Sequence, residues 1–178
     1  MFDYKKFEND IVQQMIITFN KLIAENEDLY IFSLDCTRAM DSIGVMANTI
    51  HNLEEQAEAD SEDYWYYKYC EGEWELFDTF EAVSKDMRKY LDDNSDIFTD
   101  SITYEYSDIF EKHCDKIIDH CENALVRFRQ AINQNHSDIL LNFNISEYLD
   151  SEERIEIFQK INSEIASKEY AEHVEEFT

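Results

Sequence analysis

The sequence predicts a single α+β domain, in which several helices pack on a mostly antiparallel sheet of about four strands. Three observations lead to this prediction. Apolar side chains recur every three or four positions over residues 3–26 and over about 102–134, as they do along one face of an amphipathic helix. Short apolar and aromatic runs, typical of strands, lie between these helical stretches. With 178 residues, 44% of them hydrophobic, the chain is large enough to bury one core.

A hairpin is predicted directly after the first helix. The run LYIFSLDC, residues 29–36, is apolar on both faces and therefore predicts a central strand. Residues 42–48 predict its partner, because the connection TRAMD is short enough for a hairpin. Asn48 and Thr49 are then placed to cap a short acidic helix over residues 50–60.

An aromatic run in the middle of the chain predicts the third strand. SEDYWYYKYC, residues 61–70, is rich in Tyr and Trp, which favour pleated, half-buried surfaces. Gly72 then marks a bend or bulge, and from Glu75 to about Leu91 the apolar period becomes helical. Alternate side chains of a strand face opposite sides. The two expected faces hold Trp65, Tyr67 and Tyr69, and Tyr64, Tyr66, Lys68 and Cys70.

The last third of the chain predicts a strand and a helix after the long helix. ILLNFN, residues 139–144, has the composition of a fourth strand, and residues 146–162 continue with helical periodicity. The acidic tail from about residue 167 is expected to be frayed. We find no internal repeat, linker or boundary, so residues 1–178 are expected to form one domain.

The charge of the chain limits the partners that it can bind. Forty-one Asp and Glu stand against fifteen Lys and Arg, which gives a net charge of −26, and the excess is densest between Glu54 and Glu81. Nucleic acids and anionic membranes are bound through clustered Lys and Arg, which this sequence lacks, so we expect neither as a partner. A basic protein partner is favoured, because the field would steer it towards the chain. The simpler interpretation is that the acidity only keeps the protein soluble.

We expect neither a signal peptide nor a disulfide framework in this sequence. The first residues, MFDYKKFEND, are charged, and no apolar run approaches the ~18 residues of a membrane span. We therefore expect a cytoplasmic protein. Its four cysteines, Cys36, Cys70, Cys114 and Cys121, form no CxxC pair and are expected to be buried thiols.

The run HCDKIIDHC, residues 113–121, contains metal-ligand residue types at a spacing that argues against a metal site. Its histidines are seven positions apart, as are its cysteines, which separates each pair by about 10.5 Å along a helix. The donor atoms around one zinc ion lie only about 4 Å apart. We therefore expect the cysteines on the core face with the histidines at its border, and no bound metal or cofactor.

No sequence motif identifies an active site. There is no GxSxG serine motif, and two glycines cannot build a phosphate-binding loop. Carboxylates are too frequent for any pair to stand out as a general acid and base. A Cys–His nucleophile would need Cys36 or Cys70 with a distant histidine, and burial in strands suits both thiols better. The sequence therefore predicts that the protein is not an enzyme.

Four stretches of the chain resemble, in this order, a bacterial family described only as domain of unknown function 4303. They are LYIFSLDC, IGVMANTIHNLEE, YYKYCEGEWELFDTFEAVSKDM, and ILLNFN with its following helix. The third is the most specific, since members tend to show an aromatic strand, a Glu–Trp pair, here Glu73 and Trp74, and then a helix beginning near a Phe. The resemblance implies a fold and brings no catalytic residue. By size and charge alone, such proteins are similar to immunity proteins of secreted-toxin systems.

These observations lead to the hypothesis of a non-enzymatic inhibitor of a basic protein, namely an immunity protein that covers the active cleft of a nuclease-like toxin. A nuclease must be basic to hold its substrate, so an acidic inhibitor is complementary to it. Tyr and Trp are enriched at protein interfaces, whereas base stacking would need more basic residues than the single Lys68. The predicted contact residues are Glu54, Glu55, Glu58, Glu62, Asp63, Tyr64, Tyr66, Glu71 and Glu73.

Three alternatives stay open. The protein is a phage-encoded acidic DNA mimic that blocks a host defence protein, an enzyme whose site is not visible in the sequence, or an oligomeric structural protein. The genomic neighbourhood would separate the first alternative from an immunity protein. A deep polar pocket with a strongly perturbed carboxylate or histidine would favour the second.

Overall fold

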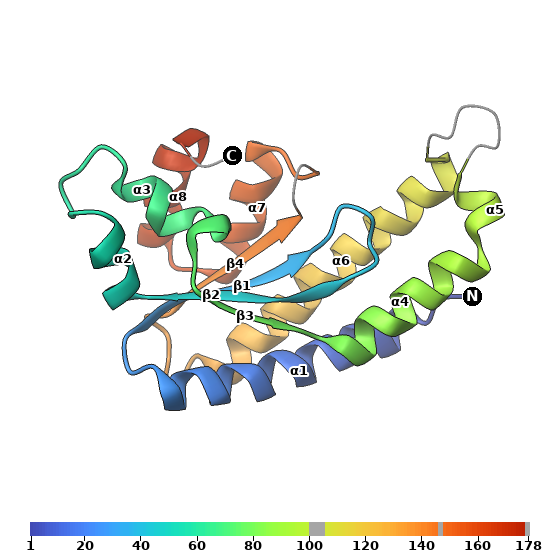
Figure 1. Ribbon diagram of the computed structural model, residues 1–178, viewed down its shortest axis with the longest axis horizontal. Coiled ribbons are helices and arrows are strands. Elements are labelled where there is room, and N and C mark those ends of the chain that lie inside the picture. The colour runs from blue at the N-terminus through green and yellow to red at the C-terminus, as the bar shows by residue number, and fades with distance from the viewer. Residues whose placement is uncertain (100–105, 146–147, 177–178) are drawn as a thin grey trace.

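The computed structural model shows a four-stranded sheet with helices on both faces (Figure 1). It describes residues 1–99, 106–145 and 148–176. The strands are β1 (Leu29–Cys36), β2 (Ile43–Thr49), β3 (Leu76–Thr79) and β4 (Leu140–Ile145). They lie in the order β3-β2-β1-β4, with β1 parallel to β4 and the other neighbours antiparallel. The predicted α+β class and the mostly antiparallel sheet are confirmed.

The helices form one layer on each face of the sheet (Figure 1). The first layer consists of α1 (Tyr4–Glu25), α4 (Glu81–Asp93) and α6 (Asp108–Ile132). The second contains α2 (Ile50–Gln56), α3 (Tyr64–Tyr69), α7 (Ser151–Ile161) and α8 (Glu164–His173). Shorter elements are α5 (Ser95–Phe98) and the 3₁₀ turns η1 (Glu71–Glu73) and η2 (Val174–Glu176).

The main core lies between the sheet and the first layer. Phe19 of α1 meets Phe32 of β1 and Phe128 of α6 edge-on, with ring centroids 5.5 and 5.4 Å apart. Such edge-to-face pairs are favoured by the charge distribution of aromatic rings. Because alternate residues of β1 and β4 point into this layer, their remaining side chains point into the second layer.

The predicted hairpin between β1 and β2 is confirmed. The helix that follows it is capped by Thr49, as predicted, but it ends at Gln56 and not at residue 60. The Thr49 hydroxyl accepts a hydrogen bond from the backbone N–H of Asn52 at 3.1 Å, which satisfies a free donor at the start of α2. Gly44 of β2 lies so close to β3 that a Cβ atom would collide with the backbone carbonyl of Asp78. The sequence therefore needs glycine where these two strands meet.

The prediction of a third strand over residues 61–70 is wrong. Residues 64–69 form helix α3, Gly72 lies in η1, and the third strand is β3, inside the stretch predicted to be helical. Trp65 and Tyr69 are four positions apart and therefore share one face of α3, which packs on α8. Tertiary packing has overridden the strand preference of these aromatic residues.

The prediction of a frayed tail is also wrong. Residues 164–173 form α8, in which Tyr170 is completely buried, and Val174 of η2 is buried as well. The long helix begins at Asp108, and the predicted part from residue 102 to 105 lies outside the described residues. The same applies to residues 146–147 of the last predicted helix, which the structure shows as α7 from Ser151.

Candidate functional site

Most of the predicted contact carboxylates gather at one end of the molecule, around α2 and α3 (left in Figure 1). Residues 54–63 run from the last turns of α2 to the start of α3, and we call them the acidic segment. All six of its carboxylates are exposed, which are Glu54, Glu55, Glu58, Asp60, Glu62 and Asp63. Five of them were predicted as contacts, and Asp60 was not.

The acidic segment is held in place by its own backbone and by two buried apolar residues. Leu53 and Ala57 are buried, and the Ala57 N–H donates to the carbonyl of Leu53 at 3.0 Å. The Ser61 N–H donates to the Glu58 carbonyl at 2.9 Å, which closes a turn before α3. The carboxylates are therefore presented on an ordered backbone.

In the part of the chain that the structure describes, no lysine or arginine is paired with a carboxylate of the acidic segment. No Lys or Arg occurs between Arg38 and Lys68. Among the described residues, the segment's one ion pair joins Glu55 to His51, at 3.4 Å. Elsewhere carboxylates are paired with lysine, for example Glu122 with Lys160 at 2.6 Å. The acidic segment is thus a concentrated source of negative potential at the surface.

Helix α3 presents one tyrosine beside the acidic segment. Tyr66 is exposed by 36%, and its hydroxyl donates to Glu73 Oε1 at 3.1 Å. Tyr64 and Glu73 are half-buried. The one cation of α3, Lys68, contacts Glu169 at 2.6 Å and lies 4.8 Å from the Trp65 ring centroid. Its charge is therefore already engaged inside the second layer.

Glu71 is not a surface residue, so its prediction as a contact is wrong. Its side chain is buried under the sheet, with the residue 5% exposed, and its carboxyl accepts a hydrogen bond from the Asn142 amide of β4. Burial raises the Glu71 pKa to about 7, although Arg154 acts in the opposite direction. The sequence predicts an exposed position for Glu71, because it lies in a run of acidic residues.

Glu71 belongs to a buried polar cluster between the sheet and the second layer. Arg154 of α7 donates to the amide oxygen of Asn144, and the Asn144 amide donates to Asp35 Oδ1 at 3.1 Å. Burial raises the pKa of Asp35 as well. The signal for this cluster was present in the sequence, since Asp35 and the two asparagines alternate with apolar residues along β1 and β4.

The two histidines and two cysteines of residues 113–121 do not form one site in α6. Cys114 and Cys121 are buried in the core as predicted, whereas His113 is itself buried and not at the border. The Tyr4 hydroxyl lies 2.8 Å from His113 Nδ1, and His120 Nδ1 lies 2.7 Å from Glu8. Within residues 1–99, 106–145 and 148–176, no group of three or more His, Cys, Asp and Glu side chains is arranged to hold a metal ion.

Groups with a shifted pKa coincide with the cavities only in part, since Lys6 and Lys89 line the cavity between α1 and α4, and Asp35 lines another at β2 and β3. Burial lowers the pKa of His113 to about 4, yet neither His113 nor Glu71 lines a cavity described in the structure. No helix in the described part of the chain is long and apolar enough to cross a membrane.

Comparison with known proteins yields one match. Residues 11–163 match the model of a family described as Domain of unknown function (DUF4303). This confirms the resemblance found in the sequence. No curated protein matches the chain, and no solved structure matches it.

Proposed function

Because this chain belongs to the DUF4303 family, whose description assigns no activity, we propose its function from its surface: it is a non-enzymatic acidic protein that binds a basic protein partner. The contact surface consists of the acidic segment and the exposed side of α3. The observation that supports this most strongly is the run of six exposed carboxylates, none of which is paired with a Lys or Arg among the described residues.

An uncompensated acidic surface suits a basic partner for two reasons. Its carboxylates can pair with Lys and Arg of the partner without first giving up a Lys or Arg of their own chain. The backbone of the segment is already ordered by the turn at Ser61, so little conformational entropy is lost on binding. Long-range attraction also speeds encounter between oppositely charged proteins.

The exposed side of α3 supplies the apolar part of the surface. Tyr66 offers a large, rigid side chain with a polar tip. Tyr64, two positions earlier in α3, lies on a different side of the helix and packs partly on the core of the second layer. Tyrosines of this kind carry much of the binding energy at protein interfaces. The hydrogen bond that the Tyr66 hydroxyl donates to Glu73 holds the Tyr66 ring in one position, which favours a defined docking geometry.

The class of partner that best fits this surface is a toxic nuclease whose cleft the protein covers. Such an enzyme carries clustered Lys and Arg, because it must hold a phosphate backbone. A protein that occupies those cations competes directly with the substrate. The role of an immunity protein follows from this complementarity, and so does that of a phage-encoded DNA mimic if the partner proves to be a host defence protein.

Affinity capture with two charge variants tests the proposal. The segment variant carries Glu54→Gln, Glu55→Gln, Glu58→Gln, Asp60→Asn, Glu62→Gln and Asp63→Asn. The matched control neutralises six exposed carboxylates elsewhere, which are Glu25, Glu27, Asp92, Asp115, Asp119 and Glu156. The wild type and the control are expected to retain a basic protein from a lysate of the native cell, whereas the segment variant loses it. Equal capture by both variants, or capture of no basic protein, would contradict the proposal.

A further inference from the structure

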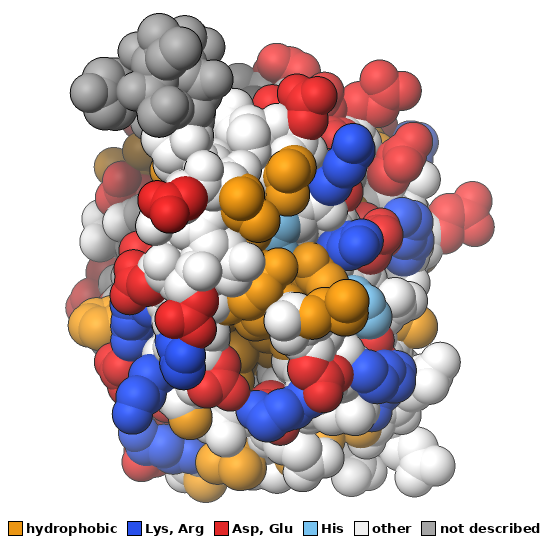
Figure 2. Space-filling model, turned by 90° about the vertical axis from the view of Figure 1, so that its right-hand side faces the viewer, with side chains coloured by type: hydrophobic (Ala, Val, Ile, Leu, Met, Phe, Trp, Pro, Cys, Tyr) orange, Lys and Arg blue, Asp and Glu red, His pale blue; other side chains and the backbone are white. Residues whose placement is uncertain are grey.

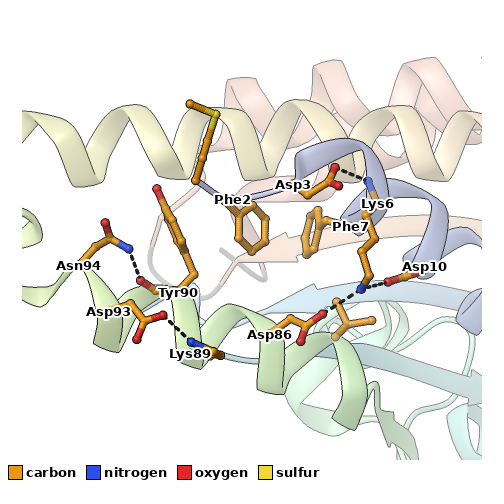
Figure 3. A pocket seen from close by; sticks show the side chains of 12 residues that line it. Phe2, Asp3, Lys6, Phe7, Asp10, Asp86, Lys89, Tyr90, Asp93 and Asn94 are labelled. Atoms are coloured by element: carbon orange, nitrogen blue, oxygen red, sulfur yellow. Dashed lines mark hydrogen bonds and ion pairs between the residues drawn. The ribbon is translucent and has the colours of Figure 1, made fainter.

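A cavity of about 450 Å³ opens between the start of α1 and helix α4 (Figure 3). It lies at the end of the molecule opposite the acidic segment (Figure 1). Figure 2 shows this face, on which hydrophobic side chains in a hollow are surrounded by charged ones. Its volume falls within the range of about 300–1,000 Å³ that is usual for small-molecule sites. The proposed partner surface does not use this cavity.

Aromatic rings form the apolar part of the cavity wall. Phe2 lies between Phe7 and Tyr90, with ring centroids 5.4 and 5.1 Å apart (Figure 3). Behind them the buried His113 ring lies 5.3 Å from Phe2 and 5.1 Å from Tyr90. This packing fixes the wall before any ligand arrives. Phe2 and Tyr90 are only half-buried, so each ring leaves part of its surface free for contact.

The rim of the cavity carries more negative than positive side chains. The carboxylates are those of Asp3, Asp10, Asp86 and Asp93, and the side-chain ammonium groups are those of Lys6 and Lys89. The amino group of Met1 is a third cation in the lining, so the carboxylates still exceed the cations by one. Lys6 Nζ lies 2.8 Å from both Asp10 and Asp86, and so bridges α1 and α4. Lys89 Nζ lies 2.5 Å from Asp93. Both lysines are therefore occupied by carboxylates of the rim.

This arrangement selects the charge of a ligand. An anion would have to displace a carboxylate from Lys6 or Lys89 and would meet the remaining carboxylates and the field of the whole chain. A cation would share Asp86 or Asp93 with the lysine that already contacts it, which a carboxylate can do through its second oxygen. The net negative charge of the rim and the negative faces of the aromatic rings would both attract it. An apolar group attached to that cation would be buried against Phe2 and Tyr90.

We propose that this cavity binds a small organic cation, namely a protonated amine that carries a flat aromatic body. The aromatic body lies against Phe2 and Tyr90, and the ammonium group is held at the rim beside Asp93 and Asp86. The site is independent of the proposed partner surface, since the two share no residue.

Three isosteric probes test the charge selection. They are 2-phenylethylamine, 2-phenylethanol and 3-phenylpropionate, which have nearly the same aromatic body and carry positive, zero and negative charge. Calorimetric titration is expected to show that the amine binds about tenfold more tightly than the alcohol, with no measurable binding of the carboxylate. Equal affinity for the three probes, tighter binding of the carboxylate, or no saturable binding of the amine would overturn the proposal.

Two variants locate the binding in the cavity. Asp93→Asn removes a rim carboxylate and releases Lys89, so amine affinity is expected to fall about tenfold. Phe2→Ala removes part of the aromatic wall and should weaken binding of the amine and of the alcohol alike. The control Asp119→Asn, an exposed carboxylate of α6, should leave amine affinity unchanged. Thermal unfolding confirms that each variant is folded, and unchanged amine affinity in folded Asp93→Asn and Phe2→Ala would refute the assignment.

Discussion

The side-chain amide of Asn142 donates a hydrogen bond to the buried carboxyl of Glu71, which lies 71 positions earlier in the chain. This contact joins strand β4 to turn η1 and places a titratable group beneath the second helix layer. Arg154 and Asp35 act on it from α7 and β1, and burial has the largest effect, raising its pKa from 4.5 to about 7. The stability of the fold should therefore depend on pH in a defined direction.

Glu71→Gln tests that dependence. Between about pH 4.5 and 7 the folded state keeps a proton on Glu71 that the unfolded chain has lost, so this group's contribution to stability falls as pH rises through the window. The variant removes the titration and keeps the shape. The difference in unfolding free energy between the variant and wild type should therefore shift in favour of the variant by on the order of 1–3 kcal/mol as pH rises from about 4 to about 8. Urea unfolding at the two pH values measures this shift. Exposed Glu62→Gln is the control, and a Glu71→Gln effect that is the same at both pH values would contradict this assignment.

Glu8 should produce the opposite pH dependence. Burial raises its pKa, but hydrogen bonds from Lys5, His120 and Arg127 outweigh this effect and lower the pKa to about 2. Its contribution is therefore present above pH 4.5 and is lost as pH falls towards 2. Glu8→Gln should cost about 2–3 kcal/mol of unfolding free energy near neutral pH and much less near pH 2. A cost that is independent of pH would show that packing, and not charge, is lost.

The two glycines of the chain form a matched pair for a backbone test. Gly44→Ala places a methyl group against the carbonyl oxygen of Asp78 and should separate β2 from β3, at a cost of about 1–3 kcal/mol. At Gly72 the nearest atom to a new Cβ is Cys70 Sγ, at 3.8 Å, so Gly72→Ala should be close to neutral. Chemical denaturation of both variants measures the difference, and equal effects would show that the β2–β3 approach is not close.

The packing of the C-terminal helix is tested at Tyr170. Its ring stacks on Phe158 at a centroid distance of 4.0 Å and meets Tyr69 of α3 edge-on at 5.1 Å. Tyr170→Ala should lower the unfolding free energy by about 3–5 kcal/mol, because it leaves a cavity between α3, α7 and α8. Ile165→Ala, at a position 85% exposed, should have little effect. Similar effects of the two substitutions would contradict the packing of α8 and would support the frayed tail that the sequence predicts.

Elements that depend on local signals were predicted well. The β1–β2 hairpin follows from two apolar runs with a short connection, and α1 and α6 follow from a sustained helical period. Thr49 was correctly placed as a helix cap for the same reason, because capping involves only the next three residues.

Elements that depend on distant contacts were not predicted. Helix α3 has six residues, too few to be stable alone, and it exists because Trp65 and Tyr69 pack on a helix about a hundred positions later. Strand β3 has four residues, which is too short for a periodicity to be recognised. The burial of Glu71 depends on where β4 and α7 lie, so a carboxylate in an acidic run was assigned to the surface.

The cavity beside α4 could not be inferred from the sequence either. Its walls come from the first residues of the chain and from a helix some eighty positions later, joined by the ion pair of Lys6 with Asp86. Each wall alone is an ordinary amphipathic helix face, and its lysines and aspartates have the composition of a solvated surface.

The most direct test of the proposed function is the affinity of the captured basic protein for the wild type and the segment variant, each measured at about 50 mM and about 300 mM salt. The account predicts that wild-type affinity falls at least about tenfold as salt rises, and that the segment variant binds far more weakly and with a flatter salt dependence. An affinity of the segment variant within about twofold of wild type at low salt would contradict the claim that these carboxylates form the partner surface.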